Sequence, residues 1–114
     1  MKTHVTIKIF EETDEILNKV AKKLKFPSVH SKKELIDKIL TDFRKQDMLK
    51  ELSLNGTISV RIFKKGYTYR KYGLHAESLE VRRELKFLFP YVDTNLLLNT
   101  IIYSKSEDML RSGR

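Results

Sequence analysis

The apolar residues of each half first alternate with polar ones, at the period of a strand, and then recur at the spacing of a helix. Over residues 4–10, polar and apolar residues alternate and the β-branched ones fall on one face, which predicts a strand. Apolar residues then recur at helical spacing, with acids first and lysines last. That order suits the helix dipole and predicts a helix over about 12–25. Pro27 ends it.

A second helix is predicted to begin at Ser31. Ser31 and Glu34 have the spacing of a capping box, in which the serine caps backbone amides and the glutamate reaches back. One face of this helix is apolar and consists of Leu35, Ile36, Ile39, Leu40 and Phe43. The helix ends in the low forties or continues to about 52, before Asn55-Gly56 breaks the chain.

The second half begins with the same alternation over residues 57–63. A turn at 64–66 follows, and residues 67–72 suit either a partner strand or a basic loop. The next apolar residues predict a helix over about 76–89. Asp93 or Thr94 is suited to cap a last helix, and from Ser104 the chain is polar and is expected to fray.

The two halves resemble each other in sequence. Val5–Phe10 matches Ile58–Phe63 with conservative changes, and the Phe-Pro segment before the second helix recurs at Phe89-Pro90. In this alignment Leu35 matches Leu98 and Ile39 matches Ile102, while the second copy carries ten extra residues. We therefore predict two units, residues 1–52 and 56–114, the second with a basic, tyrosine-rich insertion at 64–73.

One strand and two short helices cannot bury their own apolar faces. Two such units can, if their strands form an antiparallel two-stranded ribbon whose apolar face lies on four helices. The predicted fold class is therefore mainly α with short β, as strand-helix-helix twice. Leu96, Leu97 and Leu98 are too many for one helix face, so part of this run is expected in a second contact, either an oligomer interface or the core.

Composition and charge narrow the class of partner. The chain has 114 residues and a net charge of +8, with a pI near 9.7. Each half is +4, so the charge is not a basic tail. The chain lacks cysteine, which fits a reducing cytoplasm, and its longest run without an ionisable side chain, Thr94–Ser104, is too short to span a bilayer. We expect a cytoplasmic protein without membrane contact, and nucleic acid is the first partner to test.

The first unit, residues 4–43, resembles the ribbon-helix-helix (Arc/MetJ-type) DNA-binding proteins in strand length, element order and the serine-capped second helix. The resemblance implies that the outward side chains of the ribbon touch base edges in the major groove of double-stranded DNA. It also implies that the start of the second helix holds a backbone phosphate. The implied base contacts are His4, Thr6, Lys8, Thr57, Ser59 and Arg61. The expected phosphate contacts are Ser31, Lys32, Lys33, Thr94 and Asn95, together with Lys64, Lys65, Arg70 and Lys71 of the basic segment.

The second copy departs from the pattern in two places. Asp93 replaces His30 and would repel a phosphate, and the insertion has no place in the simple family pattern. The pairing of the strands has two alternatives. In the first, residues 5–10 pair with 58–63 within one chain, which gives a pseudo-dimer that reads two unequal DNA half-sites. Alternatively, the strands of two chains pair and form a homo-oligomer.

No catalytic, metal or cofactor site is predicted. His4, His30 and His75 lie in different elements without metal-ligand spacing. The expected function is that of a transcriptional repressor that binds specific DNA sequences. The alternatives are an accessory protein of a plasmid-transfer relaxosome and, in another class, an antitoxin whose residues 74–103 bind a partner.

Overall fold

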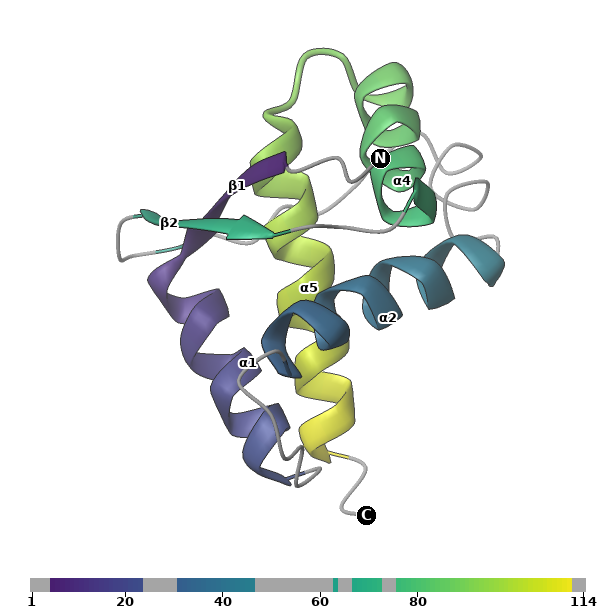
Figure 1. Ribbon diagram of the computed structural model, residues 1–114. Helices are drawn as coiled ribbons and strands as arrows, with labels where there is room; N and C mark the ends of the chain where they lie inside the picture. Colours follow the sequence, from purple (N-terminus) through teal and green to yellow (C-terminus); the bar gives the residue numbers. More distant parts are fainter. Residues whose placement is uncertain (1–4, 24–30, 47–62, 64–66, 73–75, 112–114) are drawn as a thin grey trace.

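The computed structural model describes residues 5–23, 31–46, 63, 67–72 and 76–111 (Figure 1). Within these ranges the fold is mainly α, with four helices and two short strands. The elements in chain order are β1 (Val5–Phe10), α1 (Glu11–Lys23), α2 (Ser31–Lys45), β2 (Tyr67–Tyr72), α4 (Ala76–Leu88) and α5 (Thr94–Arg111). The order strand, helix, helix therefore occurs twice.

The partner of the first strand differs from the predicted one. β1 pairs with β2 in antiparallel register, with Val5 opposite Tyr72 and Phe10 opposite Tyr67. A strand at 67–72, one of the two alternatives for that segment, is confirmed, whereas the predicted pairing of residues 5–10 with 58–63 falls on residues that the structure does not describe. Residues 57–62 lie outside the described ranges. Phe63 packs on the end of β1 through its side chain instead, because its ring stacks on Phe10 with centroids 4.2 Å apart.

This pairing also changes the alignment of the two halves. Phe89 follows the end of β2 by 17 residues, and Phe26 follows the end of β1 by 16. The ten-residue insertion therefore disappears when the repeat is aligned on β2. Of the predicted insertion at 64–73, residues 67–72 form β2, and 64–66 and 73 lie outside the described ranges.

The helices of the first half agree with the sequence pattern. α1 begins with acids, ends with lysines and buries Ile16, Leu17 and Val20. In α2 all five predicted apolar residues are buried. The amide of Gln46 donates to the Asp42 carbonyl at 3.0 Å, which closes the last turn. α2 is described to Lys45, and residues 47–52, on which the longer of the two expected lengths depends, lie outside the described ranges.

The last helix is longer than predicted. Asp93 caps α5, as expected, but the helix continues through Ser104 to Arg111, so the prediction of a frayed tail was wrong. Two contacts explain the extension. Met109 and Leu110 pack against the core. The Lys23 ammonium donates to their carbonyl oxygens at 3.2 and 2.6 Å, which satisfies acceptors that a helix end otherwise leaves open.

Both halves share one hydrophobic core, which includes Leu17, Leu40, Val81 and Leu97. α1 packs on α5, and α2 packs on both α4 and α5. The two halves are therefore related by approximate two-fold symmetry, in which the first helix of each half contacts the second helix of the other half. α5 contacts the other three described helices and β1, and Leu97 and Leu98 are both buried inside the chain.

Matched positions of the two halves are buried alike. Leu35 and Leu98 are both buried, as are Ile39 and Ile102, in agreement with the alignment of the second helices. In the first helices the buried matches are Thr13 with Ser78, Ile16 with Val81 and Val20 with Leu85, although the fully buried Leu17 then matches the exposed Arg82. The repeat is therefore expressed in the packing of the helices.

Candidate nucleic-acid interface

The two paired strands carry basic residues and no acidic ones. Lys8 lies in β1, and Arg70 and Lys71 lie in β2. Ile9 is fully buried and Lys8 is half-buried, and because successive residues of a strand point to opposite faces, Lys8 lies away from the core face. The sheet is therefore a short basic element with at least one cation on its outer side.

The register distinguishes the two basic residues of β2. Lys71 lies opposite Thr6 and Tyr69 lies opposite Lys8, whereas Arg70 lies opposite Ile7. Both basic residues of β2 therefore lie within the paired part of the sheet, directly beside β1.

Six other predicted contacts lie outside the described ranges: His4, Thr57, Ser59, Arg61, Lys64 and Lys65. Of the remaining predicted contacts, Thr6 and Lys8 lie in β1, and Arg70 and Lys71 lie in β2, which pairs with it.

Asn99 of α5 holds the outer edge of β1. Its side chain is fully buried; Oδ1 accepts from the Phe10 amide at 3.0 Å, and Nδ2 donates to the Lys8 carbonyl at 2.8 Å. These two backbone groups point away from β2, as those of every second residue do in an antiparallel pair. A single amide side chain therefore takes the place of a third strand at residues 8–10.

The start of α2 is held in place by two ion pairs. The Lys32 ammonium lies 2.9 Å from Oδ1 of Asp14, and the Lys33 ammonium lies 3.0 Å from Oδ2 of Asp37. Both pairs are partly buried. The two lysine side chains thus contact carboxylates, and the backbone amides of the first turn are what this helix start offers to a phosphate. The side chain of Ser31 lies outside the described residues.

Asp37 also joins α2 to α4. Its second oxygen, Oδ1, accepts from the Ser78 hydroxyl at 2.7 Å, and both residues are buried. A buried carboxylate needs such partners because its desolvation is otherwise costly. This contact fixes the start of α2 relative to the second half of the chain.

The start of α5 differs from that of α2 in its charge. Asp93 Oδ1 accepts from the Asn95 amide at 3.0 Å, and the Asp93 carbonyl accepts from Leu97 at 3.1 Å. The predicted phosphate contacts Thr94 and Asn95 thus lie beside a carboxylate that already binds one of their amides. The equivalent site of the second half is less suited to an anion than that of the first.

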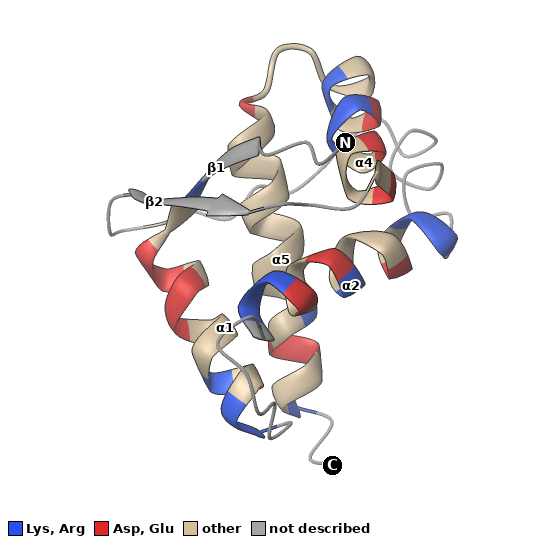
Figure 2. Cartoon of the chain, in the orientation of Figure 1, with Lys and Arg blue, Asp and Glu red and all other residues tan. Residues whose placement is uncertain are grey.

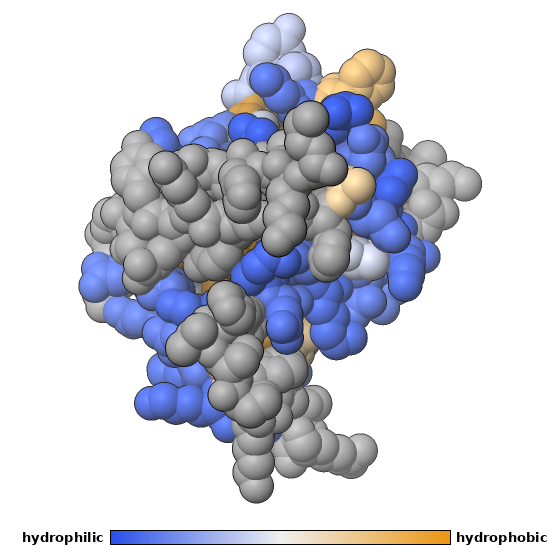
Figure 3. All heavy atoms as spheres, viewed as in Figure 1, coloured by the Kyte–Doolittle hydropathy of each residue, from blue (hydrophilic) through white to orange (hydrophobic). Residues whose placement is uncertain are grey.

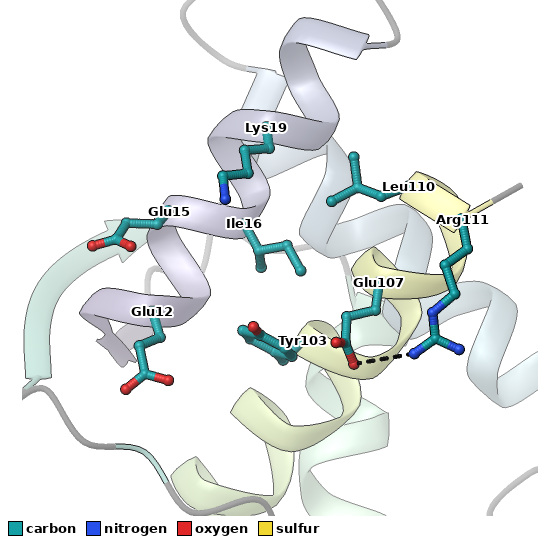
Figure 4. Close-up of a pocket in the computed structure, with 8 residues that line it drawn as sticks. All are labelled: Glu12, Glu15, Ile16, Lys19, Tyr103, Glu107, Leu110 and Arg111. Carbon is teal, nitrogen blue, oxygen red and sulfur yellow. Dashed lines mark ion pairs between the residues drawn. The ribbon is translucent and has the colours of Figure 1, made fainter. Parts of the chain in front are cut away.

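Acidic residues are also concentrated at the start of α1, and lysines at its end (Figure 2). Two of these acids, Glu12 and Glu15, line a hollow of about 320 Å³ between α1 and α5 (Figure 4). Tyr103 lies between them and the ion pair of Glu107 with Arg111, in which the atoms are 3.9 Å apart. Three carboxylates against two cations do not suit a polyanion, so this hollow is not part of the candidate interface.

The remaining surface gives few other candidates. Apolar residues form only small separate areas among the hydrophilic ones in the view of Figure 3. Among the described residues no group of histidine, aspartate and glutamate could hold a metal ion. None of the described helices is long and apolar enough to cross a membrane.

Sequence reasoning missed Asn99, Asp37 and Ser78. Asn99 could have been noticed in the sequence as a polar amide among the apolar residues of a helix face. Asp37 and Ser78 are recognisable only once α2 and α4 are known to lie side by side. No protein-family model, curated protein or solved structure matches this chain.

Proposed function

We propose that the chain is a sequence-specific double-stranded DNA-binding protein, a transcriptional repressor, that inserts its two-stranded sheet into the major groove. In this proposal the paired strands act as a ribbon and each half is a ribbon-helix-helix unit. Outer residues of the ribbon contact base edges, and the amides at the start of α2 bind a backbone phosphate.

The observation that carries the proposal is the strand-helix-helix order, present twice, with the two strands paired to each other. A two-stranded ribbon fits the width of the major groove. The ribbon carries three basic residues and no acid. A chain with net charge +8 gains affinity for DNA by releasing counterions.

The alternatives differ in what they require of the second half. A relaxosome accessory protein would use the same chemistry at another DNA site. An antitoxin would use residues 74–103 as a segment that binds a partner. Val81, Leu85 and Leu98 are buried in the common core, which favours a structural part for this half over a free binding segment.

Lys8→Gln tests the proposal. Duplexes are first enriched from a library with a random core by repeated binding to the protein. We expect Lys8→Gln to reduce discrimination between an enriched duplex and a scrambled one by about tenfold, because a base contact contributes about 1–3 kcal/mol. Fluorescence anisotropy measures both affinities.

Lys22→Gln is the matched control, because Lys22 is exposed in the last turn of α1 and the charge change is the same. It should weaken binding to both duplexes equally. Circular dichroism checks that both variants fold. Failure to enrich any duplex, or equal effects of the two variants on discrimination, would contradict the proposal.

A further inference from the structure

We propose that copies of this chain associate head to tail, with the outer face of α4 of one copy lying in the hollow between α1 and α5 of the next. This association uses neither strand, so it differs from the strand-paired homo-oligomer expected from the sequence. It also does not depend on DNA binding. Two surfaces of the chain carry it: one is aromatic and basic, and the other is acidic with an apolar and aromatic floor.

The first surface is the outer face of α4 near its end. Phe87 is 83% exposed, and Tyr91, just beyond the helix, is fully exposed. Arg83 and Lys86 are both exposed and share a helix face with Phe87, because residues three or four apart are neighbours on a helix. Glu80 pairs with Arg83 at 2.9 Å. Aromatic and arginine side chains are enriched at the centres of protein interfaces, so this basic, aromatic face is suited to an acidic partner.

The second surface is the hollow between α1 and α5. Its three carboxylates outnumber its two cations, one of which, Arg111, is already paired with Glu107. Figure 4 shows Ile16 and Leu110 pointing into the hollow from opposite helices, beside the ring of Tyr103. A cavity of about 150 Å³ is enough for a benzene ring, so the hollow of about 320 Å³ admits one aromatic side chain.

The two surfaces complement each other in shape and in charge. The ring of Phe87 fits beside Tyr103, since aromatic pairs attract each other beyond the area that they bury. Lys86 then lies near the carboxylates of Glu12 and Glu15, which line the same hollow. The partner that fits the outer face of α4 is therefore a second copy of this chain.

The two surfaces lie towards opposite ends of α5. The outer face of α4 ends at the connection that precedes Thr94, whereas the hollow is lined by residues of α5 from Tyr103 to Arg111 (Figure 1). One copy thus presents both surfaces at once. Because the surfaces are unlike, the contact is heterologous, and each copy that joins offers a surface to the next.

Sedimentation velocity of the full chain without DNA tests the association. Copies with net charge +8 repel each other at long range, so the buffer contains about 0.15 M salt, which screens charges more than about 8 Å apart. We expect the average mass to rise with protein concentration and to pass that of a dimer. A mass that stays at one chain, or that stops at two, would overturn the proposal.

Two single variants identify the surfaces. Phe87→Ala removes the aromatic anchor of the first surface, and Glu15→Lys reverses a charge at the rim of the second. Each should weaken self-association at least about tenfold, because a central aromatic side chain carries much of the binding energy and like charges across an interface are costly. Circular dichroism checks that both variants fold, as the exposure of both side chains leads us to expect.

A mixture of the two variants tests the head-to-tail arrangement itself. Phe87→Ala keeps an intact hollow and Glu15→Lys keeps an intact α4 face, so the mixture should form one-to-one pairs that grow no further. Glu11→Lys is the matched control, because it makes the same charge change at an exposed residue of α1 that does not line the hollow. Absence of pairs in the mixture, or equal weakening by Glu11→Lys and Glu15→Lys, would overturn the proposal.

Discussion

At the residue scale, the most informative side chain is Asn99. It is the one amide in the stretch Leu96–Ile102, and its matched residue in the first half is the apolar Ile36. Both are fully buried, but only the asparagine can satisfy backbone groups of β1. The periodicity of α5 predicts burial at this position, whereas the hydrogen bonds depend on β1 lying beside α5, which no local pattern encodes.

Asn99→Ala should destabilise the fold by about 2–4 kcal/mol, because it leaves the Phe10 amide and the Lys8 carbonyl without their partner and each unsatisfied buried group costs about 1–3 kcal/mol. Urea unfolding followed by circular dichroism measures this free energy. Asn95→Ala, one turn earlier in α5 and half-buried, is the control and should cost under about 1 kcal/mol. Equal losses for the two variants would mean that Asn99 acts only through helix propensity.

At the element scale, helix starts were easier to predict than helix ends. Ser31 and Asp93 mark where α2 and α5 begin, because short polar side chains before an apolar periodic run are a local signal. The end of α5 has no such signal. Residues 104–111 are mostly polar, and the helix persists there because Met109 and Leu110 reach the core and Lys23 binds their carbonyls.

The double variant Met109→Ala with Leu110→Ala tests whether the last turns of α5 are structural. We expect a loss of about 2–3 kcal/mol in the free energy of unfolding, since two half-buried apolar side chains are truncated. The exposed neighbour Asp108 gives the control variant, Asp108→Ala, which should leave stability nearly unchanged. A frayed tail would predict no loss in either protein.

The strand that pairs with β1 is in the segment that resembles β1 less in sequence. Residues 58–63 match β1 in their alternation of apolar and polar residues better than residues 67–72 do. Pairing, however, depends on which segment the connections and the helices bring beside β1. An alignment on the helices alone, from Phe26-Pro27 to Phe89-Pro90, places the second strand close to 67–72. The helix repeat was therefore the more reliable guide to the ribbon.

At the scale of the whole molecule, the shared core concerns the fold and the distribution of charge concerns the proposed DNA binding. The helical periodicity of the apolar residues predicted a mainly α fold, both second helices and their buried apolar faces. The sequence did not reveal the ion pairs of Lys32 and Lys33 with Asp14 and Asp37. These pairs lower the free positive charge at the start of α2, so the proposed DNA binding would depend on backbone amides and the ribbon as well as on net charge.

The most direct test of the central claim is the salt dependence of binding to an enriched duplex. We expect the logarithm of the association constant to fall linearly with the logarithm of the salt concentration. A slope steeper than about −3 is expected, because each neutralised phosphate contributes about −0.9. The fall should be accompanied by weaker binding of a scrambled duplex at every salt concentration. A flat dependence, or equal binding of the two duplexes throughout, would contradict the claim that this protein reads DNA.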